Sequence, residues 1–289
     1  MRFEVKVTGL LHYFLGFKIV QNQAKGSVWI GQPTYTVTLL ERFEMENAKS
    51  VKTPLSSGSQ LVKTRVSDKY VNQTLYQSAV GCLLYLSTMT RPDEAFAGSN
   101  AAKYCSNSTK EHWTAVKRVL RYVKGSRDLG LLYTNDEPME CIGYSDADWG
   151  GDKDDHKSTS GFLFQIGGIA VTWRSTKQTC VTLSTAEAEY IALTGAAQEA
   201  IWLRELTTEL DKEPTTSMVI YEDNQSTICM ARNLQFHGHT KHIDIKYHYI
   251  REQVNNRKVE LNYCLTEDMI ADVLMKGLSQ ERFEKLRVY

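Results

Sequence analysis

The sequence predicts an α/β fold with a mixed β-sheet. Short apolar segments bounded by turn residues recur in the second half of the chain, a pattern typical of strands. Two of them, 161–166 and 170–176, flank Gly167-Gly168, a hairpin turn that makes these strands antiparallel. A long amphipathic segment, 185–210, then precedes the next strand, 218–221. Strands joined through a helix are expected to be parallel, so the sheet is predicted to be mixed.

The start of the chain is predicted to be a smaller and mostly helical region. Alternation of apolar and polar residues over 11–20 and 28–32 predicts two strands, and a helix is expected from Pro33 to Phe43. The composition of residues 53–74 indicates an exposed linker.

Further helices are expected in this region before residue 126. One spans about 75–87, the next restarts at Pro92, and the third begins at a Ser108 or Thr109 cap and ends at Gly125. The third helix carries a basic face, which we interpret as solvated surface, with phosphate contact as the alternative. The basic residues of this face are Lys117, Arg118, Arg121 and Lys124.

The second half is expected to alternate strands and helices. After the helix at 185–210 come a strand at 218–221, helices at 225–233 and 242–255, a strand at 258–264 and a last helix beginning near Glu267. Strands are also expected at 139–146 and 179–183.

Composition limits the class of protein. The 289 residues are 42% hydrophobic, enough for one large domain or two modest ones, and six scattered cysteines are typical of reduced thiols. We expect an intracellular protein without membrane association, because the chain shows no long apolar run and no secretory signal. Lysine and arginine balance aspartate and glutamate at 34 each, so a nucleic-acid partner would have to be bound by local patches.

Acidic residues fall at strand ends and helix starts. Asp146 and Asp223 each end an apolar strand, and Glu187 and Glu189 open the long helix. Asp272 lies among apolar neighbours. A partly buried cluster of like charges requires compensating cations, and carboxylate oxygens suit hard divalent ions. Two such ions would promote hydrolysis of a phosphodiester, although spacing alone leaves Glu187 and Glu189 as alternatives.

Six motifs in this half resemble the ribonuclease H domain of copia-type retrotransposon Pol polyproteins. The resemblance covers about 139–275, in order. The motifs are Tyr144-Ser145-Asp146-Ala147-Asp148-Trp149, Lys157-Ser158-Thr159-Ser160-Gly161, Leu183-Ser184-Thr185-Ala186-Glu187-Ala188-Glu189-Tyr190, Asp223-Asn224-Gln225-Ser226, Thr240-Lys241-His242-Ile243-Asp244 and Ala271-Asp272-Val273-Leu274.

The resemblance implies a fold, a reaction and a set of site residues. The fold would be a ribonuclease H-like mixed sheet of five strands flanked by helices. The reaction would be cleavage of the RNA strand of RNA–DNA hybrids, with two Mg²⁺ ions, or Mn²⁺, as cofactors. The catalytic and metal-binding acids would be Asp146, Glu189, Asp223 and Asp272, and the match selects Glu189 over Glu187.

Residues 1–135 resemble the part of the same polyprotein that follows the reverse-transcriptase palm, and 136–289 would form the ribonuclease H-like domain. The motifs are Leu11-His12-Tyr13-Phe14-Leu15-Gly16, Tyr76-Gln77-Ser78-Ala79-Val80-Gly81 and Thr90-Arg91-Pro92-Asp93. The chain has no Y-x-D-D motif, so no polymerase activity is expected from it alone, and the upstream palm is an expected partner.

The alternative is a nucleic-acid-binding remnant without catalysis, against which the four intact acids argue. Two departures from the family pattern leave the proton-shuttling role unassigned and are a sign of a decaying copy. No histidine shortly precedes Asp272 to shuttle protons, and Met275 stands where the family motif carries Thr. An unfolded fragment of a longer polyprotein is a further alternative.

A histidine-rich stretch runs from residue 237 to 248. We interpret it as part of a basic strip for the hybrid backbone, with a transition-metal site as the alternative. The proposed nucleic-acid contacts are Lys241, His242, Lys246 and Arg251.

Overall fold

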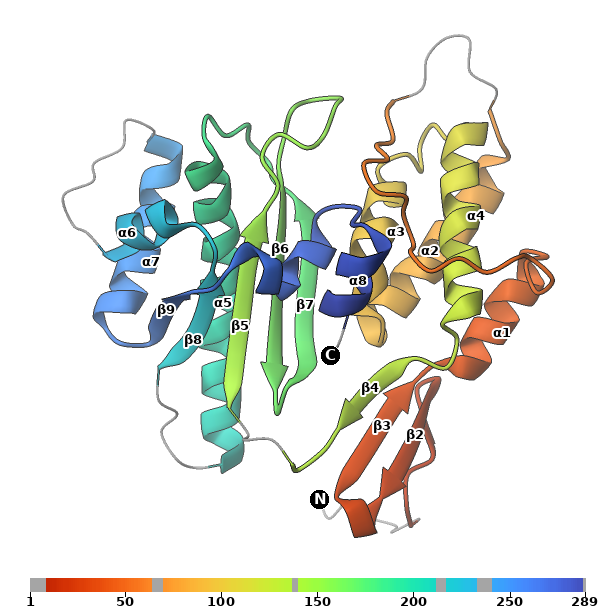
Figure 1. Cartoon of the computed structure of the whole chain (residues 1–289), viewed down its shortest axis with the longest axis horizontal. Coiled ribbons are helices and arrows are strands. Elements are labelled where there is room, and N and C mark those ends of the chain that lie inside the picture. Colours follow the sequence, from red (N-terminus) through yellow and green to blue (C-terminus); the bar gives the residue numbers. More distant parts are fainter. Residues whose placement is uncertain (1–8, 64–69, 137–139, 212–216, 233–240, 288–289) are drawn as a thin grey trace, which may run out of the picture.

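The computed structural model describes residues 9–63, 70–136, 140–211, 217–232 and 241–287. A five-stranded sheet lies beside a group of helices, and these helices adjoin a second, smaller sheet (Figure 1). The α/β class is therefore confirmed. No described helix is both long and apolar enough to cross a membrane.

The N-terminal part combines four helices with an antiparallel sheet of order β1-β2-β3-β4. The sheet forms because the segment after α4 returns to pair with β3, so that Trp29 lies opposite Leu132. This part is therefore less helical than predicted. Its elements are β1 (Tyr13–Phe14), β2 (Phe17–Asn22), β3 (Ser27–Gly31), α1 (Pro33–Arg42), α2 (Gln73–Met89), α3 (Ala95–Ala102), α4 (Lys110–Gly125) and β4 (Gly130–Tyr133), with 3₁₀ turns η1 (Gln23–Lys25) and η2 (Pro92–Glu94).

Helix α4 begins after Thr109, one of the two predicted caps, where a capping box with His112 satisfies the first turn. Its basic face holds the segment between α1 and α2. Arg121 donates to the Lys49 carbonyl at 2.6 Å and Lys124 to the Ala48 carbonyl at 2.8 Å. Arg118 donates to the Thr53 hydroxyl at 3.0 Å. These three side chains are therefore used for packing and do not form a free phosphate-binding strip.

The C-terminal part contains the mixed sheet, of order β7-β6-β5-β8-β9. Strands β5, β6 and β7 are antiparallel neighbours, whereas β5, β8 and β9 run parallel. This confirms the five-stranded mixed sheet implied by the resemblance. The elements are β5 (Cys141–Ala147), β6 (Thr159–Ile166), β7 (Ile169–Lys177), α5 (Thr185–Asp211), β8 (Met218–Glu222), α6 (Gln225–Arg232), α7 (Lys241–Asn255), β9 (Val259–Tyr263), η3 (Thr266–Asp268), η4 (Ile270–Leu274) and α8 (Gln280–Leu286).

Two predicted elements are wrong. Residues 179–183 do not form a strand, and the expected helix from Glu267 is replaced by the 3₁₀ turns η3 and η4, with α8 beginning only at Gln280. All residues from Ala271 to Met275 are buried. An amphipathic helix needs a solvated face, and this segment has none.

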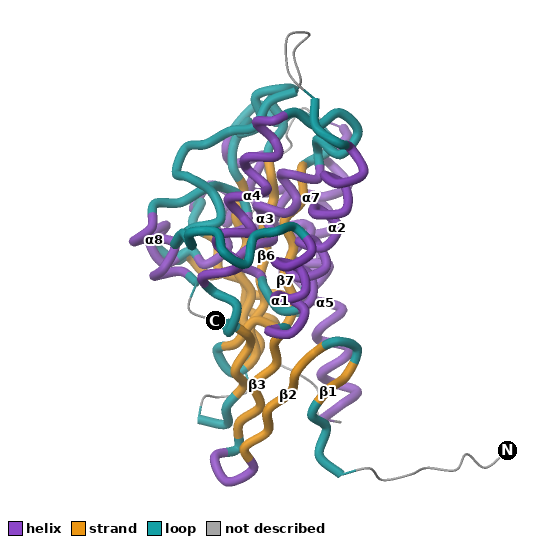
Figure 2. Tube along the Cα trace, turned by 90° about the vertical axis from the view of Figure 1, so that its right-hand side faces the viewer, coloured by secondary structure: helices purple, strands orange, loops and turns teal. Residues whose placement is uncertain are grey.

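Opposite faces of the sheet carry different elements. Helix α5 covers one face, and η4 crosses β5 and β6 on the other (Figures 1 and 2). One apolar core lies between the N-terminal helices, and a second lies on the α5 side of the sheet. A third core contains residues of both parts, among them Leu131, Leu163, Val273 and Phe283. A domain boundary after residue 135 stays a prediction, and this shared core joins the parts on either side of it.

The Thr90-Arg91-Pro92-Asp93 motif forms a buried charge network at the same junction. Arg91 pairs with Asp93 at 2.7 Å and with Glu94 at 3.0 Å, and all three side chains are at most 3% exposed. The Tyr122 hydroxyl donates to Asp93. It also accepts a hydrogen bond of 3.1 Å from Arg287, just after α8. The network thereby links η2, α4 and the C-terminal segment.

Candidate functional site

Three of the predicted acids meet at one edge of the five-stranded sheet. Asp146 lies near the carboxyl end of β5, and Asp223 directly follows the parallel neighbour β8. Glu189 projects from the first turns of α5. One oxygen of each carboxylate lies within 4.8 Å of the others. The crevice at the carboxyl ends of adjacent parallel strands is where α/β sheets bind ligands.

The fourth predicted acid, Asp272, lies beside this group without belonging to it. It is fully buried in η4 and forms ion pairs with Lys276 and, at 2.5 Å, with Arg282. Gly161 lies opposite Asp146 on β6. A Cβ there would lie 2.8 Å from Leu274 Cβ, so only glycine lets η4 approach this closely.

The electrostatics of these carboxylates favour the binding of a cation. Burial raises the pKa of Asp146 well above its usual range, and the charges of Glu189 and Asp272 raise it further. Burial likewise raises the pKa of Glu189, with added repulsion from Glu222 and Asp223. Glu189 Oε2 has no hydrogen-bond partner among the described residues. Carboxylate oxygens that repel one another suit a hard divalent cation, so these residues fit Mg²⁺ or Mn²⁺.

The neighbouring Glu187 is occupied elsewhere. Its Oε2 accepts a hydrogen bond of 2.7 Å from the Leu183 amide, and Ser184 Oγ accepts one of 3.2 Å from the Glu187 amide. Ser184 thereby caps the first turn of α5, and the Glu187 side chain accepts from the amide of the residue before the cap. Of the two glutamates that the spacing left open, Glu189 is the one at the acid cluster.

Glu222 is a further buried carboxylate beside these acids, and it is not among the residues that the sequence predicted for the site. Met218, Ile220 and Glu222 alternate along β8 and are all at most 1% exposed. Burial raises the pKa of Glu222 well above its usual range, and the charges of Asp146 and Asp223 raise it further. The period-two alternation of the strand was the signal that could have placed this carboxylate inside.

Known proteins are similar in sequence to this chain over nearly its whole length. No protein-family model matches it. The retrovirus-related Pol polyprotein from transposon TNT 1-94 of Nicotiana tabacum is 41% identical over 287 residues, which are 98% of this chain and 22% of that protein. The corresponding polyprotein from transposon RE2 of Arabidopsis thaliana is 38% identical over 98% of this chain and 19% of its own length. The chain belongs to the copia-type retrotransposon Pol polyproteins.

The chain spans about a fifth of the length of these Pol polyproteins. Its C-terminal part is the ribonuclease H-like domain of such a polyprotein. Among solved structures, the ribonuclease H1 named LC11, isolated from compost, covers 51% of this chain and 97% of its own length, at 16% identity and a TM-score of 0.37.

The four residues expected to contact nucleic acid differ in their exposure and in whether the structure describes their side chains. Lys241 and His242 begin α7, but their side chains lie outside the described residues, as does the segment 237–240 of the histidine-rich stretch. Lys246 is partly exposed. Arg251 is only 6% exposed and donates to the Met230 carbonyl at 3.1 Å. Its guanidinium therefore holds α7 against α6 and does not lie on an open surface.

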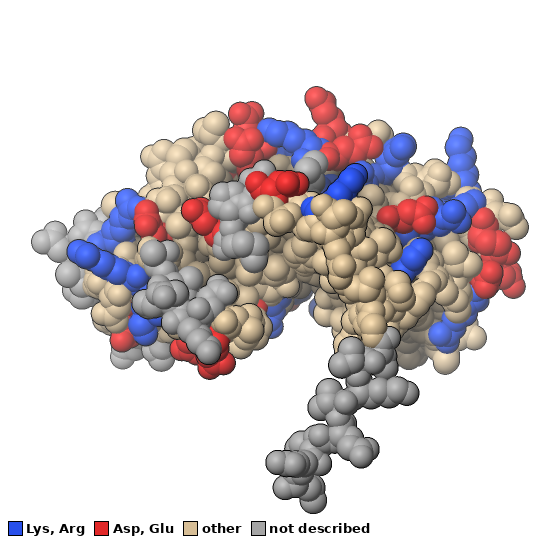
Figure 3. All heavy atoms as spheres, turned by 90° about the horizontal axis from the view of Figure 1, so that it is seen from below, with Lys and Arg blue, Asp and Glu red and all other residues tan. Residues whose placement is uncertain are grey.

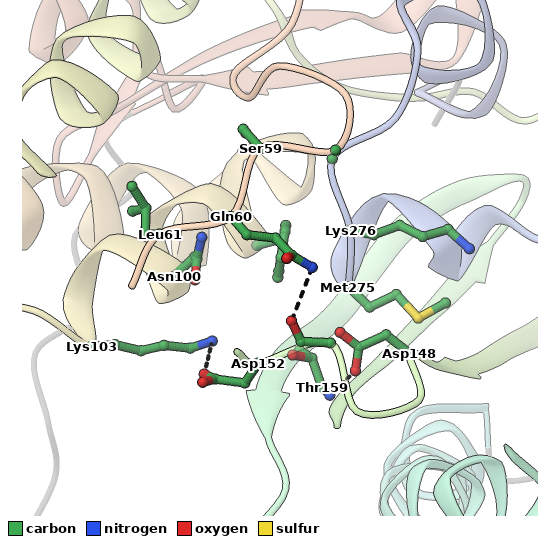
Figure 4. Close-up of a pocket in the computed structure, with 14 residues that line it drawn as sticks. Ser59, Gln60, Leu61, Asn100, Lys103, Asp148, Asp152, Thr159, Met275 and Lys276 are labelled. Atoms are coloured by element: carbon green, nitrogen blue, oxygen red, sulfur yellow. Dashed lines mark hydrogen bonds and ion pairs between the residues drawn. The ribbon is translucent and has the colours of Figure 1, made fainter. Parts of the chain in front are cut away.

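A cavity of about 220 Å³ opens next to the acids, between the two parts of the chain (Figure 4). Linker residues such as Gln60 form one wall and the loop after β5 forms another, joined where Gln60 donates to the Gly151 carbonyl at 3.2 Å. Asp148 also lines it. Burial raises the pKa of Asp148 to about 6, although its hydrogen bond from the Thr159 amide opposes this. Asp148 is therefore a largely buried carboxylate at the edge of the cavity.

Charge is balanced in and around this cavity. Lys103 and Lys276 line it together with Asp148 and Asp152, and Lys103 pairs with Asp152 at 3.1 Å. Lys177 pairs with the same carboxylate at 2.7 Å. Figure 3 shows a similar mixture of both charges on the face seen from below. The face seen in Figure 3 therefore carries no broad basic patch on its described residues, in keeping with the net charge of zero.

Proposed function

We propose that the chain is a divalent-metal-dependent endoribonuclease that cuts the RNA strand of RNA–DNA hybrids. The observation that carries the proposal is the convergence of Asp146, Glu189 and Asp223 to within 4.8 Å, from two strands and a helix. Buried carboxylates so close together destabilise the fold unless a cation binds between them. Membership in the Pol polyprotein family, with all motif acids present, supports the same function.

The four motif acids would hold the cofactor. Asp146, Glu189, Asp223 and Asp272 supply only carboxylate oxygens, the donors that Mg²⁺ and Mn²⁺ prefer. A pair of such ions supplies a nucleophilic water at neutral pH and stabilises the leaving oxygen of the phosphodiester.

The protein's own contribution is to fix these acids and to neutralise charge. Asp146 and Asp223 are fixed by adjacent strands, while Glu189 is fixed by a buried helical turn. Lys276 and Arg282 form ion pairs with Asp272, and both side chains are partly exposed. Lys276 is therefore also placed to meet a substrate phosphate next to the acids.

The proposed substrate is read by shape. Hybrid duplexes are distinguished through the backbone and the 2′-hydroxyl, so cutting should be largely independent of sequence. We propose Lys246 as a backbone contact, together with Lys241 and His242. The reverse-transcriptase palm of a Pol polyprotein is the proposed protein partner, and the proposed site of action is inside the cell.

The test is cleavage of an end-labelled RNA–DNA hybrid by the full chain, with Mg²⁺ or with EDTA. We expect Mg²⁺-dependent cutting that falls at least about 100-fold in D146N. Loss of an outer partner of a metal ligand lowers activity by up to about 100-fold, and loss of a ligand itself should have at least that effect. D128N is the matched control, because the Asp128 side chain is 76% exposed on a distant loop. Cutting by D146N at the wild-type rate would refute the assignment. Salt-sensitive binding of the hybrid by wild type without turnover would instead support the non-catalytic remnant.

A further inference from the structure

Glu222 is a fifth carboxylate behind the four acids of the motifs, and the proposed reaction does not use it. Its side chain points to the α5 side of β8, like those of Met218 and Ile220. Tyr144 of β5 pairs with Tyr221 of β8, so Ser145 and Glu222 follow as neighbours on the same face. Both are completely buried.

The hydrogen bonds of Glu222 leave half of its carboxylate unused. Oε1 accepts a hydrogen bond of 3.3 Å from the Asn224 amide. Oε2 has no partner among the described residues, and the same holds for the neighbouring Ser145 Oγ and for Glu189 Oε2. Three buried polar atoms therefore lack partners among the described residues: one belongs to Glu189 of the acid cluster, and two belong to Ser145 and Glu222, which directly precede Asp146 and Asp223. Such atoms are costly unless a further group satisfies them.

The charges around Glu222 point in the same direction. Apart from burial, the charges that raise its pKa are those of Asp146 and Asp223. In return, Glu222 is the largest charge raising the pKa of Glu189. An apolar residue would be the stabilising choice at this position, because it would continue the pattern of Met218 and Ile220. A role in packing alone therefore does not account for the carboxylate.

We infer that Glu222 is a positioning residue of the metal centre, an outer carboxylate that strengthens the hold of Asp146, Glu189 and Asp223 on a divalent cation. It lies outside the group whose oxygens are within 4.8 Å of one another, so it acts on the ligands and not as one of them. A buried negative charge beside the ligands strengthens their attraction for a divalent cation. The inference rests on the proposed function and extends it to a residue outside the family motifs quoted above.

The test measures metal binding without nucleic acid. Isothermal titration calorimetry of the full chain with Mg²⁺ and with Mn²⁺ is compared for wild type, E222Q and E260Q. E222Q keeps the size of the side chain and the acceptor for Asn224. E260Q makes the same change at an exposed position of the neighbouring strand β9.

We expect E222Q to weaken metal binding about tenfold or more. Its melting temperature without metal should stay at or above the wild-type value, because repulsion among the acids is relieved. E260Q should match wild type in both measurements. Metal affinity of E222Q within about twofold of wild type would overturn the inference. Should E222Q fail to fold, E222D decides the question: weaker binding supports the inference, and unchanged binding overturns it.

A D146N arm separates this inference from the proposed function. Loss of metal binding in D146N with normal binding in E222Q would overturn only the role of Glu222. Absence of metal binding in wild type, or equal binding in D146N, would overturn the metal centre and the role of Glu222 together.

Discussion

Gly161→Ala tests the placement of Asp272 without touching an acid. An added Cβ would lie 2.8 Å from Leu274 Cβ and 3.1 Å from the Ala271 carbonyl oxygen. Ordinary contact begins at 3.4 Å, so η4 must retreat by 3.4 − 2.8, or 0.6 Å at the least. Asp272 lies between the two displaced residues and would move with them, away from Asp146.

The expected cost is set by packing and by geometry. Overpacking of a filled core destabilises by about 1–3 kcal/mol. Misplacement of a catalytic group by about 1 Å can lower a rate roughly 100-fold, so a 0.6 Å shift should lower hybrid cleavage by about 10- to 100-fold. The acids themselves remain, and G161A should still bind a divalent cation through Asp146, Glu189 and Asp223.

The assay is urea unfolding together with hybrid cleavage in Mg²⁺. Gly81→Ala on α2 is the matched control, because a Cβ there meets nothing within 4 Å and the helix should gain up to about 1 kcal/mol. Wild-type stability and wild-type cleavage in G161A would refute the packing of η4 against β6 and the role given to Asp272.

The remaining predictions concern charges at the junction of the two parts. Burial, with repulsion from Asp93, raises the pKa of Glu94 from 4.5 to about 8 against the pull of Arg91, so its contribution to stability is lost as pH rises through that window. E94Q should abolish this part of the decline in urea midpoint between pH 4.5 and 8, and parallel curves for E94Q and wild type would contradict it. The pKa of Asp152 is shifted in the opposite direction. Hydrogen bonds from Lys177 and the Asp154 amide, together with Lys103, outweigh its burial and lower its pKa from 3.8 to about 2. Because 1.8 pKa units correspond to about 2.5 kcal/mol before screening at the exposed lysines, D152N should cost about 1–2 kcal/mol at pH 7. The difference in stability between D152N and wild type should disappear as pH falls from 3.8 to 2. An equal difference at both pH values would rule out the charge effect.

Local signals in the sequence predict much of the fold. The helix from Pro33 and the capping box at Thr109 fall where expected, and Gly167-Gly168 forms the turn between β6 and β7. The pairing of β4 with β3 and the 3₁₀ turns near Asp272 were not predictable in this way. Both depend on contacts between segments that are far apart in the sequence.

The residues of the candidate site show the same distinction between local signals and contacts between distant segments. Asp146 and Asp223 could be assigned from their places at strand ends, because the rule for parallel strands needs no further contact. Glu189 was separable from Glu187 only through the family motif, and the structure shows the physical reason in the capping role of Glu187. Arg251 was read as a surface cation because its partner, the Met230 carbonyl, lies on another helix.

The most direct test of the central claim is a crystal of the full chain grown with Mn²⁺ and measured at the manganese absorption edge. The account predicts anomalous density between the carboxylates of Asp146, Glu189 and Asp223, and its loss in D146N. A well-ordered cluster without anomalous density, at Mn²⁺ concentrations that saturate binding in solution, would contradict it.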